Sequence, residues 1–373
     1  MGRDIAIQIS TGFADGPDID LPSIRRKLEA IYAKAPITYA LIGWEPSRWP
    51  TSLAEWLQSQ GTEVYLWLPV FSGWNGLEPL IGPSGHSVDQ SYRSALGERF
   101  DFGCPAHPAN VAHILELFLR EHASHSYDGV FLDKVRFPSF IDGMASVMTC
   151  FCPDCVSRFG TSRAFQIEDV TDDPDENPLG LTSYRDLCYG FEDDRVAALF
   201  AYKAQAVTQS MTTIVQWFRD HGLKVGFDLF APFLSYFVGQ DYATLLPLAD
   251  FIKPMFYRMT NAPAGIPFEI DRYVAAFPGN AEDLTRRRQR LMRVLRTDRI
   301  DLDFINREID GIRRLSGDTK VLAGFEINRN DVAPVAPSYV AENVSCLDAD
   351  GIALSWDLRS TPDDNLQAVR DNI

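Results

Sequence analysis

The sequence predicts a (β/α)8 TIM barrel, an α/β fold in which eight parallel strands alternate with helices and close into a cylinder. Two observations predict it. Eight short runs of apolar, β-branched and aromatic residues recur along the 373 residues, and each precedes a stretch with helical periodicity. In addition, no Gly-x-Gly-x-x-Gly follows the first run and no phosphate-binding loop occurs elsewhere, which disfavours an open, doubly wound sheet. We therefore expect residues 1–373 to form a single catalytic-type barrel domain.

The expected strands are short and rich in apolar residues, as strands buried in a parallel sheet are. They are residues 5–10, 37–44, 63–70, 129–133, 224–230, 251–257, 320–327 and 351–356. Several of the expected helices have proline near their first turn, where the missing N–H costs nothing. The expected helices are residues 21–33, 52–60, 108–123, 191–222, 243–248, 302–315, 338–347 and 363–372.

Two connections are too long to be plain linkers. Residues 71–107 follow the third strand, and residues 138–190 follow the fourth. Both leave the carboxyl ends of their strands, which is the face where barrels of this kind build their active sites from loops. We therefore expect the functional site at this face.

Four of the six cysteines form a pattern in these two loops. Cys150, Cys152 and Cys155 form a C-x-C-x-x-C cluster, and Cys104 lies in the other loop. Loops after neighbouring strands are adjacent, so the four thiolates can converge on one tetrahedral zinc ion. Such a site is structural, because four protein ligands leave no open position. A pair of disulfides and free thiols are the alternatives.

No secretory signal is recognisable in the first ten residues, which predicts a cytoplasmic protein and favours zinc over disulfides. The zinc-bound subregion would consist of residues 71–107 and 138–190.

Three segments resemble known families. CPAHP at 104–108 and CFCPDC at 150–155 are similar to the four-cysteine zinc cluster of family 42 β-galactosidases, which place an Asn-Glu pair where this chain has Leu132 and Asp133. DGVFLDKVRFP at 128–138 is similar to the fourth-strand segment of uncharacterised glycoside-hydrolase-like barrels. The resemblance implies a barrel that cleaves sugars.

Glycosidic bond cleavage generally needs two carboxyl groups that flank the bond. Asp133, Asp228 and Glu326 lie near the carboxyl ends of the fourth, fifth and seventh expected strands. The resemblance implies that Asp133 protonates the leaving group and Glu326 attacks the anomeric carbon. It also allows the pair Asp133 and Asp228, because the glycoside-hydrolase-like barrels carry an Asp near the end of strand 5. Ion pairing that only fixes the barrel mouth is the non-catalytic alternative.

Aromatic and polar residues are dense near the same face. Flat rings there can stack on the apolar face of a pyranose, and cations can bind hydroxyl groups or a sugar carboxylate. Trp67 is expected in the core because it lies in mid-strand. The expected substrate-binding residues are Glu45, Trp74, Arg136, Lys253, Tyr257, Trp356 and Asp357.

Composition and missing motifs exclude several classes of protein. Lys and Arg total 35 against 51 Asp and Glu, a net charge of 35 − 51 = −16, which disfavours nucleic-acid binding. No apolar run approaches the ~20 residues that cross a bilayer, so we expect no membrane partner. No H-E-x-x-H or Gly-x-Ser-x-Gly pattern occurs, which disfavours a catalytic metal and a serine hydrolase, and no organic cofactor is expected.

The sequence thus predicts a glycoside hydrolase that acts on a carbohydrate through paired carboxylates. A carbohydrate-binding barrel without activity is one alternative. A lyase or isomerase that acts on sugar acids and depends on a divalent metal is another. A symmetric homo-oligomer is possible on general grounds.

Overall fold

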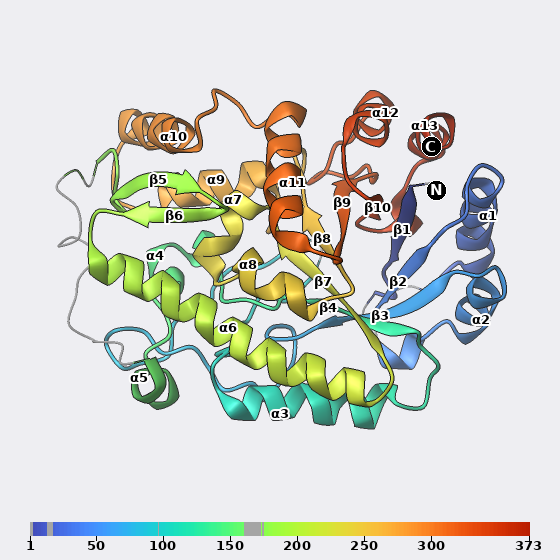
Figure 1. Ribbon diagram of the computed structural model, residues 1–373, viewed down its shortest axis with the longest axis horizontal. Coiled ribbons are helices and arrows are strands. Elements are labelled where there is room, and N and C mark those ends of the chain that lie inside the picture. Colours follow the sequence, from blue (N-terminus) through green and yellow to red (C-terminus); the bar gives the residue numbers. More distant parts are fainter. Residues whose placement is uncertain (1–2, 13–17, 96, 160–172, 174) are drawn as a thin grey trace.

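The computed structural model describes residues 3–12, 18–95, 97–159, 173 and 175–373. Eight parallel strands in this part of the chain close into a barrel in the order β1-β10-β9-β8-β7-β4-β3-β2 (Figure 1). All eight expected strands are confirmed, with shifts of a few residues at their ends. They are β1 (Asp4–Ile9), β2 (Tyr39–Gly43), β3 (Glu63–Pro69), β4 (Gly129–Asp133), β7 (Lys224–Phe230), β8 (Phe251–Met255), β9 (Lys320–Glu326) and β10 (Gly351–Ser355).

Each expected helix has a counterpart outside the barrel. These are α1 (Leu21–Tyr32), α2 (Thr51–Ser59), α3 (Pro108–Leu117), α6 (Asp194–Asp220), α8 (Tyr242–Leu245), α11 (Leu302–Ser316), α12 (Pro337–Cys346) and α13 (Asp363–Asn372). Most helix boundaries differ from the prediction by a few residues, and two of these differences have a clear local cause. The third helix ends in a π-helical turn, η2 (Phe118–His122), and α6 begins at Asp194 because Asp193 caps it and Phe191 belongs to a strand. No helix in the described residues is both long and apolar enough to span a membrane.

The long connection after β4 contains more regular structure than the sequence pattern predicts. An antiparallel hairpin of β5 (Leu181–Arg185) and β6 (Cys188–Phe191) precedes α6, and the short helices α4 (Met144–Val147) and α5 (Pro153–Phe159) precede the hairpin. Residues 160–172 and 174 of this predicted loop lie outside the described residues.

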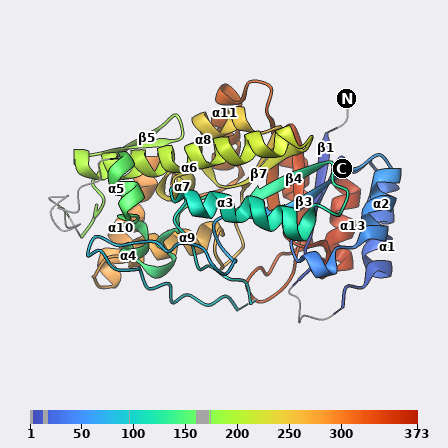
Figure 2. The same ribbon diagram turned by 90° about the horizontal axis from the view of Figure 1, so that it is seen from below.

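A third long connection, residues 256–301 after β8, is absent from the sequence prediction. It carries α9 (Ile266–Ala275) and α10 (Ala281–Leu295). Figures 1 and 2 both show α4, α5, α9, α10 and the hairpin together at one end of the molecule, away from α1 and α2. Arg290 of α10 donates to the carbonyl of Leu181 at 3.0 Å, which joins this connection to the hairpin.

The described residues also contain several short helical turns. They are η1 (Pro46–Arg48), η3 (Phe140–Asp142), α7 (Pro232–Ser235), η5 (Tyr236–Val238), η6 (Leu246–Leu248) and η7 (Leu358–Ser360). Most of them lie in the connections that follow the carboxyl ends of strands, so they shape the rim where the polar inward residues emerge.

Aromatic side chains fill the lower interior of the barrel. The Phe251 ring stacks on Tyr39 at 4.8 Å and meets Tyr65 edge-on at 5.2 Å, measured between ring centroids. Gly226 makes room for it, since a Cβ there would lie 2.3 Å from the Phe251 ring. These rings fill the barrel near the amino ends of the strands. The inward-facing residues one layer closer to the carboxyl ends therefore form the floor of any pocket at that face.

That next inward layer is polar. Gln8 of β1, Asp228 of β7 and Lys253 of β8 are all buried there, two positions along from the aromatic layer. Gly324 of β9 accommodates the lysine, because a Cβ at this position would lie 2.5 Å from Lys253 Cε. Burying these groups in an apolar cylinder costs several kcal/mol unless they find partners or face a pocket.

Candidate active site

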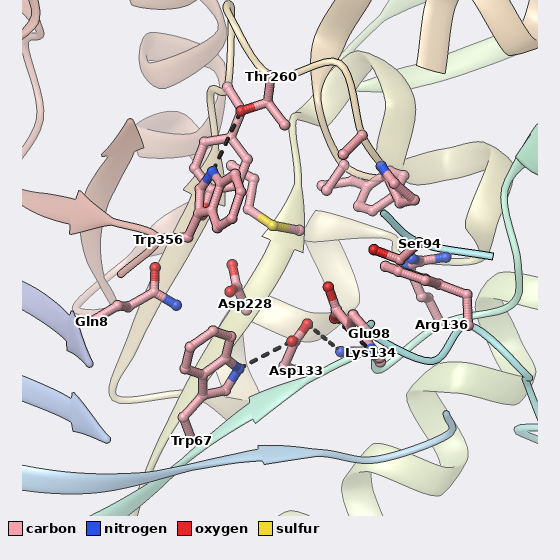
Figure 3. Close-up of a pocket in the computed structure, with 17 residues that line it drawn as sticks. Gln8, Trp67, Ser94, Glu98, Asp133, Lys134, Arg136, Asp228, Thr260 and Trp356 are labelled. Carbon is pink, nitrogen blue, oxygen red and sulfur yellow. Dashed lines mark hydrogen bonds and ion pairs between the residues drawn. The ribbon is translucent and has the colours of Figure 1, made fainter. Parts of the chain in front are cut away.

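A pocket of about 650 Å³, its open mouth included, lies at the carboxyl ends of the strands. We call it the central pocket. Inward side chains of the strands form its floor, among them Gln8, Asp133 and Asp228. Loops form its walls, with Glu98 from the connection after β3 and Thr260 from the connection after β8 (Figure 3).

Asp133 and Asp228 lie side by side on neighbouring strands. Leu132 pairs with Phe227 in the register of β4 and β7, so the next residue of each strand is the aspartate. Neighbouring strands are about 4.8 Å apart, and residues at the same level point to the same face. Figure 3 shows both carboxyl groups directed into the same hollow. Two carboxyl groups therefore meet in one pocket, as the sequence predicts for a barrel rim.

N–H donors hold Asp133 in place. Trp67 Nε1 donates to its Oδ2 at 3.0 Å, and the backbone N–H of Lys134 donates to its Oδ1 at 2.5 Å. Lys134 has a left-handed backbone (φ 52°), which is uncommon for a residue with a side chain and is typical of functional sites. Its ammonium binds Glu98 at 2.9 Å and stays at the pocket wall.

Asp228 is almost completely buried and only half satisfied. Its Oδ2 accepts from Lys253 Nζ at 2.9 Å, while its Oδ1 is buried and has no hydrogen-bond partner among the described residues. Burial raises the pKa of Asp228 to about 7, the nearby Lys253 lowers it in part, and the charge of Asp133 adds to the rise. The unpaired oxygen and the raised pKa are typical of a carboxyl group that acts on a ligand.

Lys253 connects Asp228 to two neutral side chains. Its ammonium donates to Gln8 Oε1 at 2.9 Å and to the Tyr257 hydroxyl at 2.7 Å. Burial lowers the pKa of Lys253, and Asp228 opposes that change. Lys253 is fully enclosed beneath the pocket, whereas Tyr257 lines it. The lysine therefore fixes the side chains of Gln8 and Tyr257, both of which line the pocket.

Arg136 is a buried cation in the pocket wall. Its guanidinium lies between the rings of Phe102 and Phe230, at 4.5 and 4.3 Å from their centroids, and donates to the carbonyl of Phe137 at 3.0 Å. Burial lowers its pKa to about 10, so the group stays charged at neutral pH. Aromatic packing on both faces fixes the plane in which it can donate hydrogen bonds.

Glu45 and Trp74 lie outside the central pocket and line a neighbouring hollow of about 540 Å³, which we call the side pocket. Glu45 accepts from the Ser47 hydroxyl at 2.6 Å, and Trp74 Nε1 donates to the carbonyl of Pro69 at 2.7 Å. Both residues thus reach a hollow at the same face as the two aspartates.

Glu326 faces a different set of partners. It is fully buried and does not belong to the lining of the central pocket in the described residues. Its Oε1 accepts from the N–H groups of Met259 and Thr260 at 2.8 and 2.9 Å, and its Oε2 accepts from the Tyr339 hydroxyl. These donors take up both carboxylate oxygens, so Glu326 anchors the connection after β8.

We expect Glu326→Gln to lower the free energy of unfolding by about 1 to 3 kcal/mol, because an NH₂ group replaces one of the two oxygens that accept from the protein's N–H and O–H donors. The glycoside cleavage that the sequence predicts should change far less per folded molecule than it does in an Asp228→Asn variant. Thermal melting and steady-state kinetics measure the two effects. Loss of all activity in a Glu326→Gln protein that melts normally would contradict this anchoring role and would support Glu326 as nucleophile.

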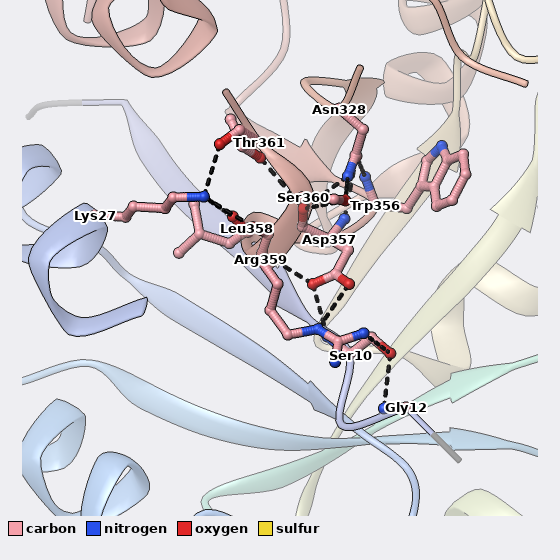
Figure 4. A network of polar contacts seen from close by, with 10 residues as sticks. All are labelled: Ser10, Gly12, Lys27, Asn328, Trp356, Asp357, Leu358, Arg359, Ser360 and Thr361. Atoms are coloured by element: carbon pink, nitrogen blue, oxygen red, sulfur yellow. Dashed lines mark hydrogen bonds and ion pairs between the residues drawn. The ribbon is translucent and has the colours of Figure 1, made fainter. Parts of the chain in front are cut away.

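Trp356 and Asp357 follow β10 but have separate environments (Figure 4). The Trp356 ring lines the central pocket, and its Nε1 donates to Thr260 Oγ1 at 3.4 Å. Asp357 points instead toward Arg359 and accepts from its Nε at 2.9 Å. Asn328 Oδ1 accepts from the backbone N–H groups of both residues, at 2.7 and 3.2 Å. The network fixes the backbone that carries Trp356.

Several residues of the central pocket were not among the sequence-based candidates, and Gln8, Trp67 and Glu98 are three of them. Gln8 carried a signal, because a polar residue within an apolar strand needs a polar destination. Trp67 lies in the barrel interior as expected, and its indole N–H also reaches Asp133. Glu98 lies in a long loop with no local pattern, so only the folded chain places it beside Lys134.

The four cysteines predicted as metal ligands come together. Their sulfur atoms all lie within 4.8 Å of one another, all four residues are buried, and none forms a disulfide. Cys104 Sγ lies 3.8 Å from Cys152 Sγ and 3.5 Å from Cys155 Sγ. Four sulfurs at about 2.3 Å from a tetrahedral zinc ion are about 3.8 Å apart, so the spacing fits such an ion.

Backbone donors also point at this cluster. The N–H groups of Ile81 and Cys152 donate to Cys150 Sγ at 3.3 and 3.4 Å. N–H groups directed at sulfur stabilise a thiolate and are typical of the surroundings of metal-bound cysteines. The cluster joins the connections after β3 and β4, both of which line or approach the central pocket.

No protein-family model matches the chain, and no curated protein matches its sequence. Its fold is similar to the glycoside hydrolase domain of PgaB (BpsB) from Bordetella bronchiseptica, with a TM-score of 0.54 and 15% identity over 99% of this chain and 98% of that one. It is also similar to a β-galactosidase from the psychrophilic Marinomonas ef1, with a TM-score of 0.54 and 10% identity over 98% of this chain and 58% of that one. At these identities the likeness establishes the barrel fold.

Proposed function

We propose that the chain is a glycoside hydrolase whose reaction takes place between Asp133 and Asp228. The observation that carries the proposal is the pairing of these two aspartates at one level of neighbouring strands, inside one pocket at the carboxyl face of the barrel. Two carboxyl groups that flank a bond are the common machinery of glycosidic hydrolysis. The fold shared with two glycoside hydrolases agrees with this function.

Of the two carboxylate pairs that the sequence leaves open, the contacts favour Asp133 with Asp228. Asp133 and Asp228 both line the central pocket, whereas Glu326 does not belong to its lining in the described residues. A group that attacks, protonates or activates water must face the space that holds the substrate. Glu326 would have to break its contacts with the connection after β8 first.

The two aspartates differ in environment, and this difference suggests their roles. Burial beside Lys253 raises the pKa of Asp228 to about 7, so Asp228 holds a proton below that pH and can donate it to the leaving oxygen. Asp133 accepts two hydrogen bonds from N–H groups, which stabilise its negative charge. Asp133 then serves as the ionised partner that acts on the anomeric carbon. These roles are the reverse of those that the family resemblance implies for Asp133.

Other lining residues suit a sugar. The Trp356 and Tyr257 rings lie in the wall of the central pocket and can stack on the apolar face of a pyranose. Arg136 presents donors that can bind hydroxyl or carbonyl oxygens. A pocket with few charges in fixed positions and aromatic walls is typical of a small-molecule binding site.

The pH profile tests the role of Asp228. We expect kcat/KM for glycoside hydrolysis to fall as the pH rises through about 7, because Asp228 loses the proton that it must donate. The sign follows from the requirement for the neutral acid, which is present below the pKa and absent above it. A glycosyl fluoride, whose leaving group needs no protonation, should lack this decline. A profile that instead rises through pH 7 would contradict the assignment.

A panel of substrates tests the activity itself. The purified chain would be incubated with aryl glycosides and with cello-, xylo-, malto- and chito-oligosaccharides, and the released sugars would be measured. We expect turnover of at least one of them. Binding of an oligosaccharide without any cleavage, at every pH from 4 to about 9, would contradict the hydrolase and support a carbohydrate-binding barrel.

We further propose that the four-cysteine cluster holds a structural zinc ion. Cys104, Cys150, Cys152 and Cys155 would supply all four ligands, and the ion would fix the connections after β3 and β4 in the positions where they border the central pocket. We infer from the single closed barrel that residues 1–373 act as one catalytic unit.

A further inference from the structure

The central pocket and the side pocket share part of their lining. Three residues, Glu98, Asp133 and Lys134, line both pockets. The two hollows are therefore adjacent, and the proposed catalytic Asp133 borders both. Asp228, in contrast, lines only the central pocket.

The side pocket has the chemistry of a sugar-binding site. Two indole rings, Trp44 and Trp74, line it together with the carboxylate of Glu45. The Trp44 ring packs edge-on against Trp67, with centroids 5.0 Å apart, and the Trp74 indole is fixed by its hydrogen bond to Pro69. Held rings offer flat apolar surface at little entropic cost, and the carboxylates can accept from several hydroxyl groups.

The side pocket also carries both signs of charge. Arg99 and Lys134 face it along with Glu45 and Glu98. Arg99 pairs with Asp101 at 3.2 Å and Lys134 pairs with Glu98 at 2.9 Å, so the cations are largely compensated. A neutral sugar ring rich in hydroxyl groups fits such a lining better than an anionic ligand does, since an anion would also meet the carboxylates of Glu45 and Asp133.

We propose that the side pocket binds a second sugar ring, so that the substrate is an oligosaccharide or polysaccharide rather than a single sugar on a small aglycone. The inference rests on the proposed function and adds the substrate class to it. The ring that reacts occupies the central pocket, because only there can both Asp133 and Asp228 reach it. The adjoining ring lies across Asp133, on the Trp44 and Trp74 side.

Trp74 provides the test. We compare kcat/KM of Trp74→Ala on two substrates, a trisaccharide of the preferred sugar and the fluoride of that single sugar. We expect the loss on the trisaccharide to exceed the loss on the fluoride by about tenfold or more, because a lost buried aromatic contact is worth about this factor. A single-sugar fluoride fills the central pocket alone. Trp74→Phe, which keeps a ring, should recover most of the difference. An equal loss on both substrates, or no loss on the trisaccharide, would overturn the proposal.

A matched control is available in α2. Trp56 is half-buried like Trp74, packs on Tyr32 and Arg25, and belongs to neither pocket. Trp56→Ala should therefore lower activity on the trisaccharide and on the fluoride to the same small extent. A selective loss on the trisaccharide in this variant would show that a general effect of tryptophan removal accounts for the result, and would overturn the proposal.

A binding measurement separates this proposal from the proposed hydrolase. Calorimetry would compare cello-, xylo-, malto- and chitohexaose binding to the wild-type chain and to Trp74→Ala. Suppose that the wild type cleaves none of them but binds one about tenfold more tightly than the variant does. This result would support the sugar-binding role of the side pocket and would contradict the proposed hydrolase activity. Cleavage of oligosaccharides with unchanged affinity in the variant would leave the hydrolase standing and overturn the side pocket. Binding of none would overturn both.

Discussion

Replacing Asp133 by asparagine is expected to lower kcat/KM for glycoside hydrolysis by about a thousandfold or more, the scale of a lost catalytic carboxylate. The amide cannot carry the negative charge that acts on the anomeric carbon. The fold should persist, because the amide oxygen of the new side chain still accepts a hydrogen bond from either Trp67 or Lys134. The other N–H group loses its acceptor, which lowers the free energy of unfolding by about 1 to 3 kcal/mol. Initial rates and a thermal melt of the same preparation measure both effects.

Asp128 supplies the matched control at the opposite end of the same strand. Its Oδ2 accepts from the backbone N–H of Val64 at 2.8 Å and from Gln58 at 3.0 Å, remote from the carboxyl face. Asp128→Asn should lower the free energy of unfolding by about as much as Asp133→Asn does. It should leave the rate of hydrolysis per folded molecule almost unchanged. Equal loss of activity in the two variants would show that carboxylate removal acts through folding, contrary to the role assigned to Asp133.

Removal of the metal from the cysteine cluster is expected to have the largest effect on stability. We expect Cys152→Ser to lower the free energy of unfolding by several kcal/mol, since structural zinc sites contribute about 10 kcal/mol or more to folding when intact. The purified wild type should contain close to one zinc per chain by elemental analysis. A chelator strong enough to extract the ion should lower the melting temperature as the substitution does.

Two cysteines outside the cluster provide controls. Cys188 is half-buried and Cys346 is exposed, and neither lies among the four converging sulfur atoms. Cys346→Ser should leave zinc content and melting temperature unchanged. A wild-type protein in which all four cluster thiols titrate freely, with no zinc and a melting temperature insensitive to chelators, would contradict the metal site.

The barrel itself was predictable from the sequence because each strand is a dense apolar run and each run is followed by a helix. The connection after β8 was not. Its helix α10 is rich in arginine and contains few apolar residues, so a search for apolar runs did not reveal it, although those few residues lie on one face. Its capping box, in which Asn280 and Asp283 bond each other's backbone N–H groups, was the available signal.

The candidate site was predictable only where strand alternation determines it. Asp133 and Asp228 occupy inward positions at matching levels, and both facts follow from strands that the sequence defines well. Glu326 is also placed at a strand end, but its partners come from Met259, Thr260 and Tyr339 in other connections. No local pattern reports which loop will donate to a buried carboxylate, so sequence alone left Glu326 and Asp228 as equal candidates.

The cysteine cluster lies between these cases. Spacing within C-x-C-x-x-C predicted that three sulfur atoms would converge, and the adjacency of loops after neighbouring strands predicted that Cys104 would join them. The contacts confirm the convergence. The side pocket, in contrast, depends on how residues 71–107 fold back over Lys134, and nothing in the sequence of that connection foretells it.

A crystal structure of the Asp133→Asn variant with an uncleaved oligosaccharide would test the central claim most directly. We expect a glycosidic bond in the central pocket, with its oxygen within hydrogen-bonding distance of the Asp228 carboxyl group, its anomeric carbon next to residue 133, and the adjoining ring against Trp74. A glycan bound with its anomeric carbons remote from Asp228, or placed against a Glu326 side chain released from its anchors, would contradict it.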